Sequence, residues 1–451
     1  MKTFILSFLV LLLIFFALAF VCGGRHSDGP ADAFVAWAKQ NAVPIMTVEP
    51  GKGFADLEGL KGIVGAARLV FLGESRHDAH EQALLKHRMV EFLVEKMGFT
   101  AFVLEESVPH AARLNEFILN GRGDLRRLLN GLAYWFLWDT EEMFNLITWM
   151  RHYNEDPANA TKLRFYGMDI VAPGLAVANV LAYLDTVDPG FAASLRGKPL
   201  GQDLFDDGNW PKSAERYESL SLEQKAALKA NYAELVGTME KQRGPYVARS
   251  SAGEYEWALR EALVAQAGNE MFSSGSRVAG GVIRDRAMAD NLRWIMEHEA
   301  HGERIIVCAH NLHIARDTFL MPGESGERLS DVACHLSKEL GSDMVSIGAS
   351  FNRGRYARVG SGEDVVFAPA DSNSVDGALA RVGSPRFMLD LRDAPKKGAV
   401  ADWLGSEQRM RAQDFDVELI PARAYDAVYF VDSISRSTQN PQALERLGIQ
   451  E

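Results

Sequence analysis

Short apolar runs that alternate with long helical stretches constrain the fold of this chain more than any other feature of its sequence. Each run is mostly apolar along its whole length, and stretches with helical periodicity such as 79–97 and 285–299 lie beside the runs. Strands that are apolar on both sides are typical of a sheet that helices cover on both faces. The sequence therefore predicts an α/β fold with a mostly parallel central sheet flanked by helices. The expected strands are 68–72, 101–104, 163–166, 304–308, 344–347, 386–389 and 427–431.

The strand pattern stops between about 203 and 272, where charged helical stretches take its place. We expect an inserted helical region there, packed beside the sheet. The Gly- and Ser-rich stretch 354–376 is typical of an extended surface loop. The other expected boundaries are a linker at 24–33, a main domain at 34–435 and a C-terminal tail at 436–451.

Acidic and imidazole side chains directly follow the first four of these runs. Glu74 and His77 follow the first run, Glu105 the second, Asp169 the third, and His310 with His313 the fourth. Ligands of open parallel sheets bind in the crevice beyond the carboxyl ends of the strands. If the four strands are neighbours, these side chains converge on one cleft.

Two pairs of residues three apart are the informative units within this set. Glu74 with His77, and His310 with His313, each lie on one face of a turn. A single carboxylate after a strand is more often a helix cap than a catalytic group, and Asp169 fits capping well. The coincidence of both pairs with strand ends is what favours a catalytic cleft.

Arg284 begins the helical stretch before the fourth run. It could bind an anionic group of a substrate, or it could pair with Asp285 and Asp290 on a solvated helix face. Exposed ion pairs are common and contribute little, so the solvated face is the default interpretation.

Several familiar catalytic signatures are absent from the sequence. It contains no Gly-x-Ser-x-Gly elbow, no His-Glu-x-x-His motif, no P-loop and no dinucleotide fingerprint. Cys308 lies inside an apolar run, so we expect a buried, inert thiol. The aromatic stretch 133–138 is typical of core, although one wall of an apolar substrate cleft has the same pattern.

The net charge and the N-terminal sequence limit which partners and which cellular compartment are expected for the protein. The net charge is −12, so electrostatics give no support for nucleic-acid binding. Residues 4–21 form an uninterrupted apolar stretch after Lys2, and we expect residues 1–23 to be a signal peptide or an N-terminal membrane anchor. The protein is therefore expected to be exported, either periplasmic or anchored in a membrane and facing outside the cytoplasm.

Further blocks of sequence connect these residues to a known family. The chain resembles the erythromycin esterase-like hydrolases over roughly residues 34–432, with the matching blocks in order and at sensible spacing. The blocks are Leu72–His77, Lys86–Phe99, Trp138–Glu142, Trp149–Asn154, Phe165–Asp169, Arg284–Asn291, Ala309–His313, Val345–Gly348 and Asp390–Arg392.

The resemblance implies a fold and a chemistry. It implies a central sheet flanked by helices with a helical region beside it, and a cleft that hydrolyses an ester, in known members a macrolide lactone. The essential histidine of the family falls on His77, its partner glutamate on Glu74, and the carboxylate after the second strand on Glu105. The later paired histidines of the family fall on His310 and His313.

The chain departs from the family pattern around these residues. Arg76 and Asp78 replace small or neutral residues, and Leu312 replaces a glycine. These changes add bulk and charge at the mouth of the cleft and count against a macrolide as substrate. Export also differs from the cytoplasmic antibiotic-resistance enzymes of the family.

The expected mechanism is metal-independent hydrolysis of a small-molecule ester or lactone by activated water. His77 acts as general base and Glu74 orients it, as the carboxylate does in a catalytic triad. His310 or His313, helped by Arg76 or Arg284, stabilises the oxyanion that develops on the carbonyl. The candidate substrate-binding residues are Arg76, Lys86, Asp169 and Arg284.

Two alternatives remain open from the sequence. One is a metal- or haem-binding accessory protein of the same fold without esterase activity. The other is a zinc-dependent hydrolase, because imidazole and carboxylate are common zinc ligands. Its ligands would come from Glu74, His77, His310 and His313.

Overall fold

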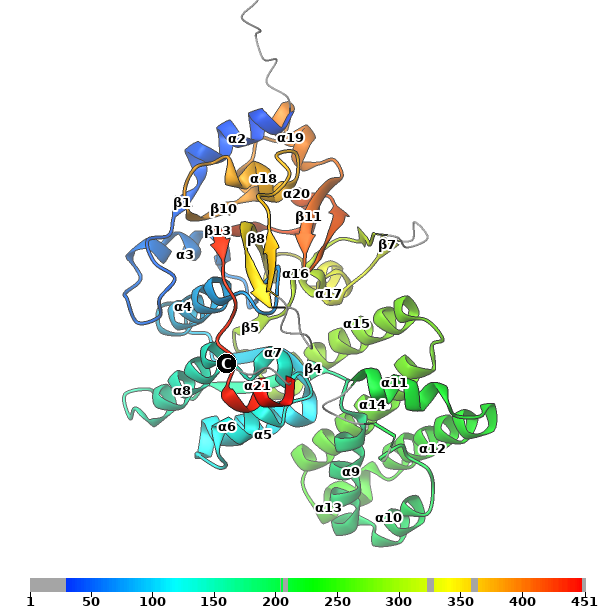
Figure 1. Ribbon diagram of the computed structural model, residues 1–451. Coiled ribbons are helices and arrows are strands. Elements are labelled where there is room, and N and C mark those ends of the chain that lie inside the picture. Colours follow the sequence, from blue (N-terminus) through cyan, green and yellow to red (C-terminus); the bar gives the residue numbers. More distant parts are fainter. Residues whose placement is uncertain (1–29, 203, 206–209, 323–327, 358–363, 448–451) are drawn as a thin grey trace, which may run out of the picture.

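The central sheet confirms the predicted fold class. A computed structural model describes residues 30–202, 204–205, 210–322, 328–357 and 364–447, and its strands form one large sheet (Figure 1). The strand order is β1-β10-β13-β8-β2-β5-β3-β4, and β9 pairs with β8. All pairs from β13 to β4 are parallel, whereas β1, β10 and β9 pair in the antiparallel sense.

Every predicted run forms a strand of this sheet. The bounds are β1 Val43–Pro44, β2 Leu69–Leu72, β3 Ala101–Ser107, β4 Arg164–Asp169, β5 Ile305–Cys308, β8 Met344–Ala357, β9 Asp364–Phe367, β10 Arg386–Asp390 and β13 Ala427–Ile434. The four strands that precede the candidate site residues are direct neighbours, in the order β2-β5-β3-β4. Cys308 at the end of β5 pairs with Leu72 of β2 and with Leu104 of β3, so the chain segments that follow leave the sheet at one level.

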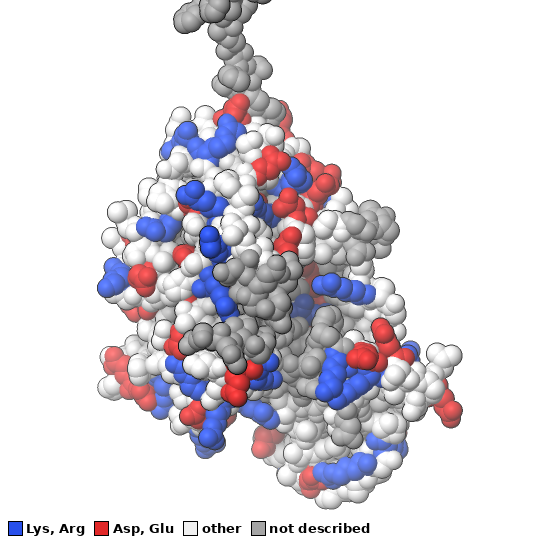
Figure 2. All heavy atoms as spheres, in the orientation of Figure 1, with Lys and Arg blue, Asp and Glu red and all other residues white. Residues whose placement is uncertain are grey.

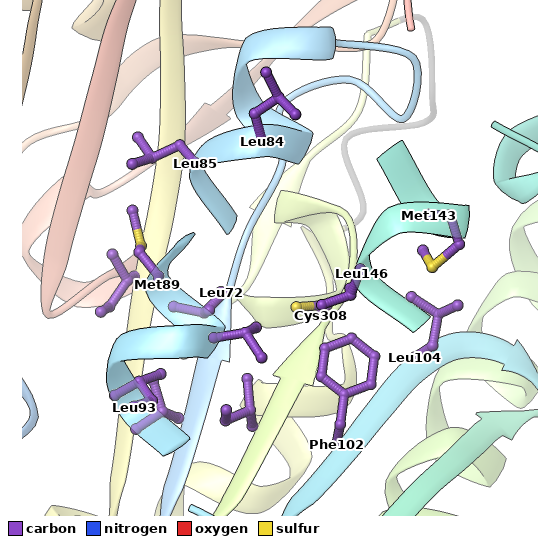
Figure 3. Packing of buried hydrophobic residues seen from close by; sticks show 14 of the residues in the cluster. Leu72, Leu84, Leu85, Met89, Leu93, Phe102, Leu104, Met143, Leu146 and Cys308 are labelled. Atoms are coloured by element: carbon purple, nitrogen blue, oxygen red, sulfur yellow. The ribbon is translucent and has the colours of Figure 1, made fainter. Parts of the chain in front are cut away.

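Successive side chains of the buried strands belong alternately to two apolar layers, one on each face of the sheet. Val70 and Leu72 of β2 belong to one cluster, whereas Leu69 and Phe71 belong to the cluster on the other face. This is the period of two that a strand imposes on its side chains. Figure 3 shows part of the first cluster, where Leu84, Leu85, Met89 and Leu93 pack over Leu72 and Phe102.

Helices cover both layers of the sheet. The first layer is closed by α4 (His80–Met97), α5 (Val108–Asn120) and α8 (Glu141–Glu155), and the second by α2 (Pro30–Asn41), α15 (Arg277–Trp294), α17 (Val332–Leu340), α18 (Val375–Ala380) and α19 (Ala399–Leu404). The shorter helices are α3 (Gly59–Val64), α6 (Leu125–Asn130), α7 (Trp135–Trp138), α16 (Asn311–Ile314) and α20 (Pro421–Ala424).

A run of helices without strands forms a separate part of the molecule, at the lower right of Figure 1. It consists of α9 (Pro173–Val187), α10 (Pro189–Arg196), α11 (Trp210–Glu218), α12 (Leu222–Lys241), α13 (Arg243–Arg249) and α14 (Ala252–Ser273), and α15 leads back to the sheet. These helices share an apolar cluster of their own. The described residues of the stretch 203–272 lie within this region, which begins earlier, at α9, because the apolar face of α9 packs against α14.

The stretch 354–376, which was expected to be a surface loop, is structured over most of its described part. Strand β8 continues to Ala357, β9 returns beside it, and α18 begins at Val375. The prediction of a loop was wrong because Gly354 does not form a turn. This glycine lets β8 approach β13 closely. A Cβ at Gly354 would lie 2.4 Å from Ile434 of β13, so only glycine fits this parallel pairing.

A second, small antiparallel sheet lies at the edge of the fold. Its order is β11-β12-β6-β7, with bounds β6 Phe319–Leu320, β7 Arg328–Leu329, β11 Gln408–Ala412 and β12 Phe415–Leu419. Ala412 pairs with Phe415, so a two-residue turn, Gln413-Asp414, joins β11 to β12.

The segment after β13 crosses the beginnings of α4 and α8 before it ends in α21 (Pro441–Leu447). Isolated bridges join Ala79 to Arg436 and Thr140 to Gln439. At the other terminus, the expected signal or anchor at 1–23 lies outside the described residues. In the described part of the chain, no helix is long and apolar enough to cross a membrane. Lys, Arg, Asp and Glu are interspersed on the face that Figure 2 shows.

Candidate active site

The loop after β2 holds Glu74 against two basic side chains. Nδ1 of His77 lies 2.5 Å from Oε1 of Glu74, and Oε2 of Glu74 accepts a hydrogen bond from Nζ of Lys86 on α4. Burial acts to raise the pKa of Glu74, but the charge of Lys86 and the hydrogen bond from His77 outweigh burial and lower it. Glu74 is therefore an ionised carboxylate that fixes one ring nitrogen of His77.

His310, at the end of β5, is a structural imidazole with both ring nitrogens engaged. Nδ1 accepts the backbone N–H of Leu312 at 3.2 Å, which makes His310 the N-cap of α16. Nε2 lies 3.0 Å from the carbonyl oxygen of Ser75, so the ring proton is assigned to Nε2. Burial lowers the pKa of His310 to about 3 and keeps the ring neutral.

His313, three residues later, lies between two carboxylates. Nδ1 lies 2.5 Å from Asp285 on α15, and Nε2 lies 3.0 Å from Oε1 of Glu105. Burial acts to lower the pKa of His313, but Glu105 and Asp285 outweigh it and raise the pKa to about 10. His313 is therefore an imidazolium at neutral pH, with Nδ1–H donating to Asp285 and Nε2 in an ion pair with Glu105.

Glu105 and Asp169 converge on one guanidinium from the ends of β3 and β4. Nη2 of Arg284 lies 2.8 Å from Oε1 of Glu105 and 2.5 Å from Oδ2 of Asp169, and Nε lies 3.0 Å from the same Asp169 oxygen. The second oxygen of Glu105 accepts the backbone N–H of His310 at 2.9 Å. Although burial opposes ionisation, the charge and hydrogen bond of His313 and the charge of Arg284 hold the pKa of Glu105 well below its usual range.

The prediction that Arg284 forms ion pairs on a solvated helix face is therefore wrong. Asp285 pairs with His313 and Asp290 with Arg293, while Arg284 points to the buried ends of β3 and β4. Capping does not explain Asp169 either, since the N-cap position of α9 is Ala172 without a side-chain hydrogen bond.

The Glu74–His77–Lys86 cluster opens into a small, mostly apolar cavity of about 30 Å³. Phe102, Leu104, Met143, Leu146 and Cys308 line it, and Figure 3 shows these side chains together. Leu137 and Trp138 also line it, so the aromatic stretch 133–138 provides one wall of the cavity. The ring of Trp138 meets the ring of His77 edge-on, with centroids 5.6 Å apart. A cavity of this size has room for a water molecule next to His77.

Comparisons with known proteins identify the family of this chain. A family model described as erythromycin esterase matches residues 94–434. Erythromycin esterase type II of Escherichia coli is 24% identical over 438 residues, which cover 90% of this chain and 98% of that protein. The chain belongs to the erythromycin esterase family.

Two solved structures share the fold of this family member. A crystal structure of a Bacillus cereus protein matches with a TM-score of 0.77 and 26% identity, covering 91% of this chain and 99% of that chain. A structure of an erythromycin esterase mutant in its open conformation matches with a TM-score of 0.71 and 19% identity, covering 88% and 98% of the two chains. Membership of the erythromycin esterase family supports hydrolase activity.

Within this family fold, Arg76 is turned away from the cavity-lining cluster. Its Nε lies 2.8 Å from Asp78, its Nη1 lies 2.5 Å from Asp414, and its guanidinium stacks 3.5 Å from the ring centre of Tyr356. The other three candidate substrate-binding residues lie close to the histidines, with Lys86 on the cavity wall and Asp169 paired to Arg284.

The imidazoles of this site do not fit a shared metal ion. His310 uses both ring nitrogens for backbone groups, and His313 uses both for carboxylates. Nδ1 of His77 is held by Glu74. In the described part of the chain, no group of three or more His, Cys, Asp or Glu residues is arranged to hold a metal ion.

Cys308 lies on the cavity wall but is not a nucleophile at neutral pH. Its side chain is buried, and burial raises the pKa of the thiol to about 12. The thiol therefore stays protonated, in agreement with the inert cysteine expected from the sequence.

Sequence reasoning missed the far wall of the cavity. Glu142 at the start of α8 lies 2.5 Å from Nδ1 of His80 and accepts the backbone N–H of Thr438 at 3.0 Å, and Ser437 lines the cavity beside it. The local signals were the cap residue Thr140 before an acidic pair and the family block Trp138–Glu142. Contact with the segment after β13 spans about 300 residues of sequence, and periodicity carries no information on such contacts.

Proposed function

We propose that this family member is an exported hydrolase that cleaves a small-molecule ester or lactone with a water molecule activated by His77. The observation that carries the proposal is the imidazole of His77, fixed through Nδ1 by a buried carboxylate on the wall of an apolar cavity. Among the described residues, Nε2 of His77 has no hydrogen-bond partner, whereas Nδ1 is bound to Glu74. A neutral ring with its proton on Nδ1 therefore has the Nε2 lone pair available to a water molecule.

The chemistry follows from this tautomer. The water oxygen attacks the carbonyl carbon of the ester while Nε2 of His77 takes the water proton. Glu74 stabilises the imidazolium that forms, because its carboxylate already accepts the Nδ1 proton. When the tetrahedral intermediate collapses, the bond from carbon to the leaving oxygen breaks, and Nε2–H returns the proton to that oxygen.

Lys86 is the cation best placed to stabilise the oxyanion. Its ammonium group lies on the cavity wall next to Glu74, and the charge of Glu74 raises the pKa of Lys86 although burial opposes this. Fixed charges in a site that excludes water stabilise developing charge more than charges in water do. His313 and Arg284 act further back, where they hold Glu105 ionised.

The expected substrate is apolar around the scissile bond, because Phe102, Leu104 and Leu146 surround the cavity. Erythromycin esterase type II is similar to this chain along its length, which supports an ester or lactone as substrate class. Export rests on the apolar stretch 4–21 of the sequence and is tested by fractionation of the cell that makes the protein.

Hydrolysis assays on macrolides, simple lactones and acylated sugars test the proposal. We expect His77→Ala to lose about 10²–10⁴-fold in kcat, the usual contribution of a general base. His152→Ala, which changes an exposed histidine of α8, is the matched control and should keep wild-type rates. A chelator should leave the wild-type rate unchanged. Activity of His77→Ala within a few-fold of wild type would exclude His77 as the base, and chelator-sensitive hydrolysis would favour the zinc alternative.

A further inference from the structure

The turn between β11 and β12 touches the loop that carries the proposed catalytic pair. The backbone N–H of Gln413 donates to the carbonyl oxygen of Ser75 at 2.8 Å. The next residue, Asp414, lies 2.5 Å from Nη1 of Arg76. Ser75 and Arg76 are the two residues between Glu74 and His77, so the turn contacts the segment that joins these two residues.

Ser75 is fixed from three directions. Its carbonyl oxygen accepts the N–H of Gln413 and lies 3.0 Å from Nε2 of His310. On its other side, the N–H of Ser75 donates to Gln82 at 3.0 Å, and its hydroxyl accepts a hydrogen bond from Gln82 at 2.7 Å. The carbonyl oxygen of Ser75 is therefore contacted from two sides. Gln413 of the small sheet contacts it, and so does His310, which follows β5 of the large sheet.

Arg76 carries the second half of this connection. Its side chain is only 4% exposed and bridges Asp78 of its own loop to Asp414 of the turn. The guanidinium stacks on Tyr356 of β8 and lies 5.3 Å from the ring centre of Phe367 on β9. A planar cation with two carboxylates and a stacked ring has little freedom to move.

The backbone of Gln413 is in an unfavourable conformation. Its φ of +55° makes it the one non-glycine residue with positive φ in the described part of the chain. For a residue with a side chain this region is unfavourable, and glycine would reach it more easily. Such conformations persist where the surroundings over-determine them, and they cluster near functional sites.

We propose that Arg76, Gln413 and Asp414 form a clasp that positions His77 for catalysis. The clasp fixes the Ser75-Arg76 segment, and through it the distance between Glu74 and His77. This inference rests on the proposed function. It assigns Arg76 an intramolecular positioning role in place of the substrate contact expected from the sequence.

Kinetics of Asp414→Ala test the clasp. We expect kcat to fall about 10- to 100-fold, because small displacements of a catalytic group are costly, while KM stays within about twofold. Asp414→Glu, which keeps the carboxylate, should recover most of the rate. Glu407→Ala is the matched control, because Glu407 is as exposed as Asp414 and pairs with Arg328 within the same small sheet. The control should keep the wild-type kcat.

A double-mutant cycle shows whether Arg76 and Asp414 act as one unit. Arg76→Gln and Asp414→Ala should each lower kcat, and the double variant should lose little more than the worse single variant. Independent, multiplicative losses in kcat would contradict the clasp. A fall in folded yield or Tm with unchanged kcat per folded molecule would also overturn it, since that is the behaviour of a purely structural contact.

A substrate-independent measurement separates this proposal from the proposed function. The proton between Nδ1 of His77 and Glu74 should give a downfield NMR resonance that His77→Ala removes. Asp414→Ala should shift or broaden this resonance, and Glu407→Ala should not. If the wild type hydrolyses no ester, the proposed function fails, and the resonance still decides on the clasp. An unaltered resonance in Asp414→Ala would reject the clasp.

Discussion

The loops after β2 and β5 each carry a pair of titratable residues three apart, Glu74 with His77 and His310 with His313, yet they hold their imidazoles in different states. His310 is neutral with both nitrogens bound to backbone groups, and His313 is charged between two carboxylates. His77 has one carboxylate partner, Glu74, whose charge Lys86 already offsets. Spacing brings imidazoles to a cleft, whereas the number of carboxylates around each ring decides its chemistry.

This difference divides the site into two parts. The β2 loop forms the turnover side, and the ends of β3, β4 and β5 form the supporting side. The β2 loop keeps a ring nitrogen next to the cavity and a single anion behind it. The ends of β3, β4 and β5 form a closed set of ion pairs around Arg284 and His313. We therefore expect substitutions in the β2 loop to change the rate, and substitutions around Arg284 to change stability.

The largest effect is expected from Glu74→Gln. The amide removes the anion that fixes the tautomer of His77, and the equivalent change in a serine protease triad costs about 10⁴-fold in kcat. We expect a loss of about 10³–10⁴-fold in kcat/KM, measured on a hydrolysed ester and normalised to folded protein.

Asp285→Asn is the matched comparison for Glu74→Gln. It also replaces a carboxylate that lies 2.5 Å from an imidazole nitrogen, but at His313. We expect a loss below about tenfold in kcat/KM, because Glu105 still pairs with that ring. Equal losses in the two variants would contradict the division into a turnover side and a supporting side.

The next effect is a loss of stability in Arg284→Met. The variant leaves Glu105 and Asp169, both buried, without their shared cation. Removing one partner of a buried ion pair typically costs about 3–5 kcal/mol in the free energy of unfolding. Urea unfolding at pH 7 measures this loss.

Arg293→Met provides the control for Arg284→Met. Arg293 also pairs with two carboxylates, Asp290 and Glu339, but both of those are more than half exposed. Exposed pairs contribute at most about 1 kcal/mol, so this variant should unfold close to wild type. If both variants lost the same stability, burial of the Arg284 cluster would not be the decisive feature.

The sequence predicted the sheet because local patterns encode it. Apolar runs such as 101–104 and 304–308 are buried on both faces and lie in the interior of the sheet. The convergence of Glu74, Glu105 and His310 followed from one rule about parallel strands. Strands β1, β6 and β7 escaped prediction, because two-residue strands carry too few side chains for a period to be visible.

The partners within the site could not be predicted, because they depend on helix directions in space. Arg284 next to Asp285 is an ordinary surface pattern in sequence, and only the path of α15 over β4 turns it toward Asp169. Arg76 is a plausible anion-binding residue by position, but its partner Asp414 lies 338 residues away in another sheet. Long-range ion pairs of this kind have no local signature.

The smallest predicted effect is the dependence of stability on pH, which distinguishes His310 from His313. The pKa of His313 is raised to about 10, so its contribution to stability is complete below pH 6.5 and declines as pH rises toward 10. The pKa of His310 is lowered to about 3, so its contribution is complete above pH 6.5 and declines as pH falls toward 3. The two residues therefore limit stability at opposite ends of the pH range.

His313→Gln should remove the alkaline decline alone. Between pH 7 and pH 9 we expect the free energy of unfolding to fall more steeply in the wild type than in the variant, by about 1 kcal/mol per pH unit. Urea titrations at both pH values measure the slope, and His152→Gln, at an exposed position of α8, serves as the control with the wild-type slope. The acid decline between pH 6.5 and 4 should persist in His313→Gln, because His310 still has to remain neutral in the fold. Parallel slopes of the wild type and His313→Gln above pH 7 would show that the carboxylates of Glu105 and Asp285 do not hold His313 as a cation.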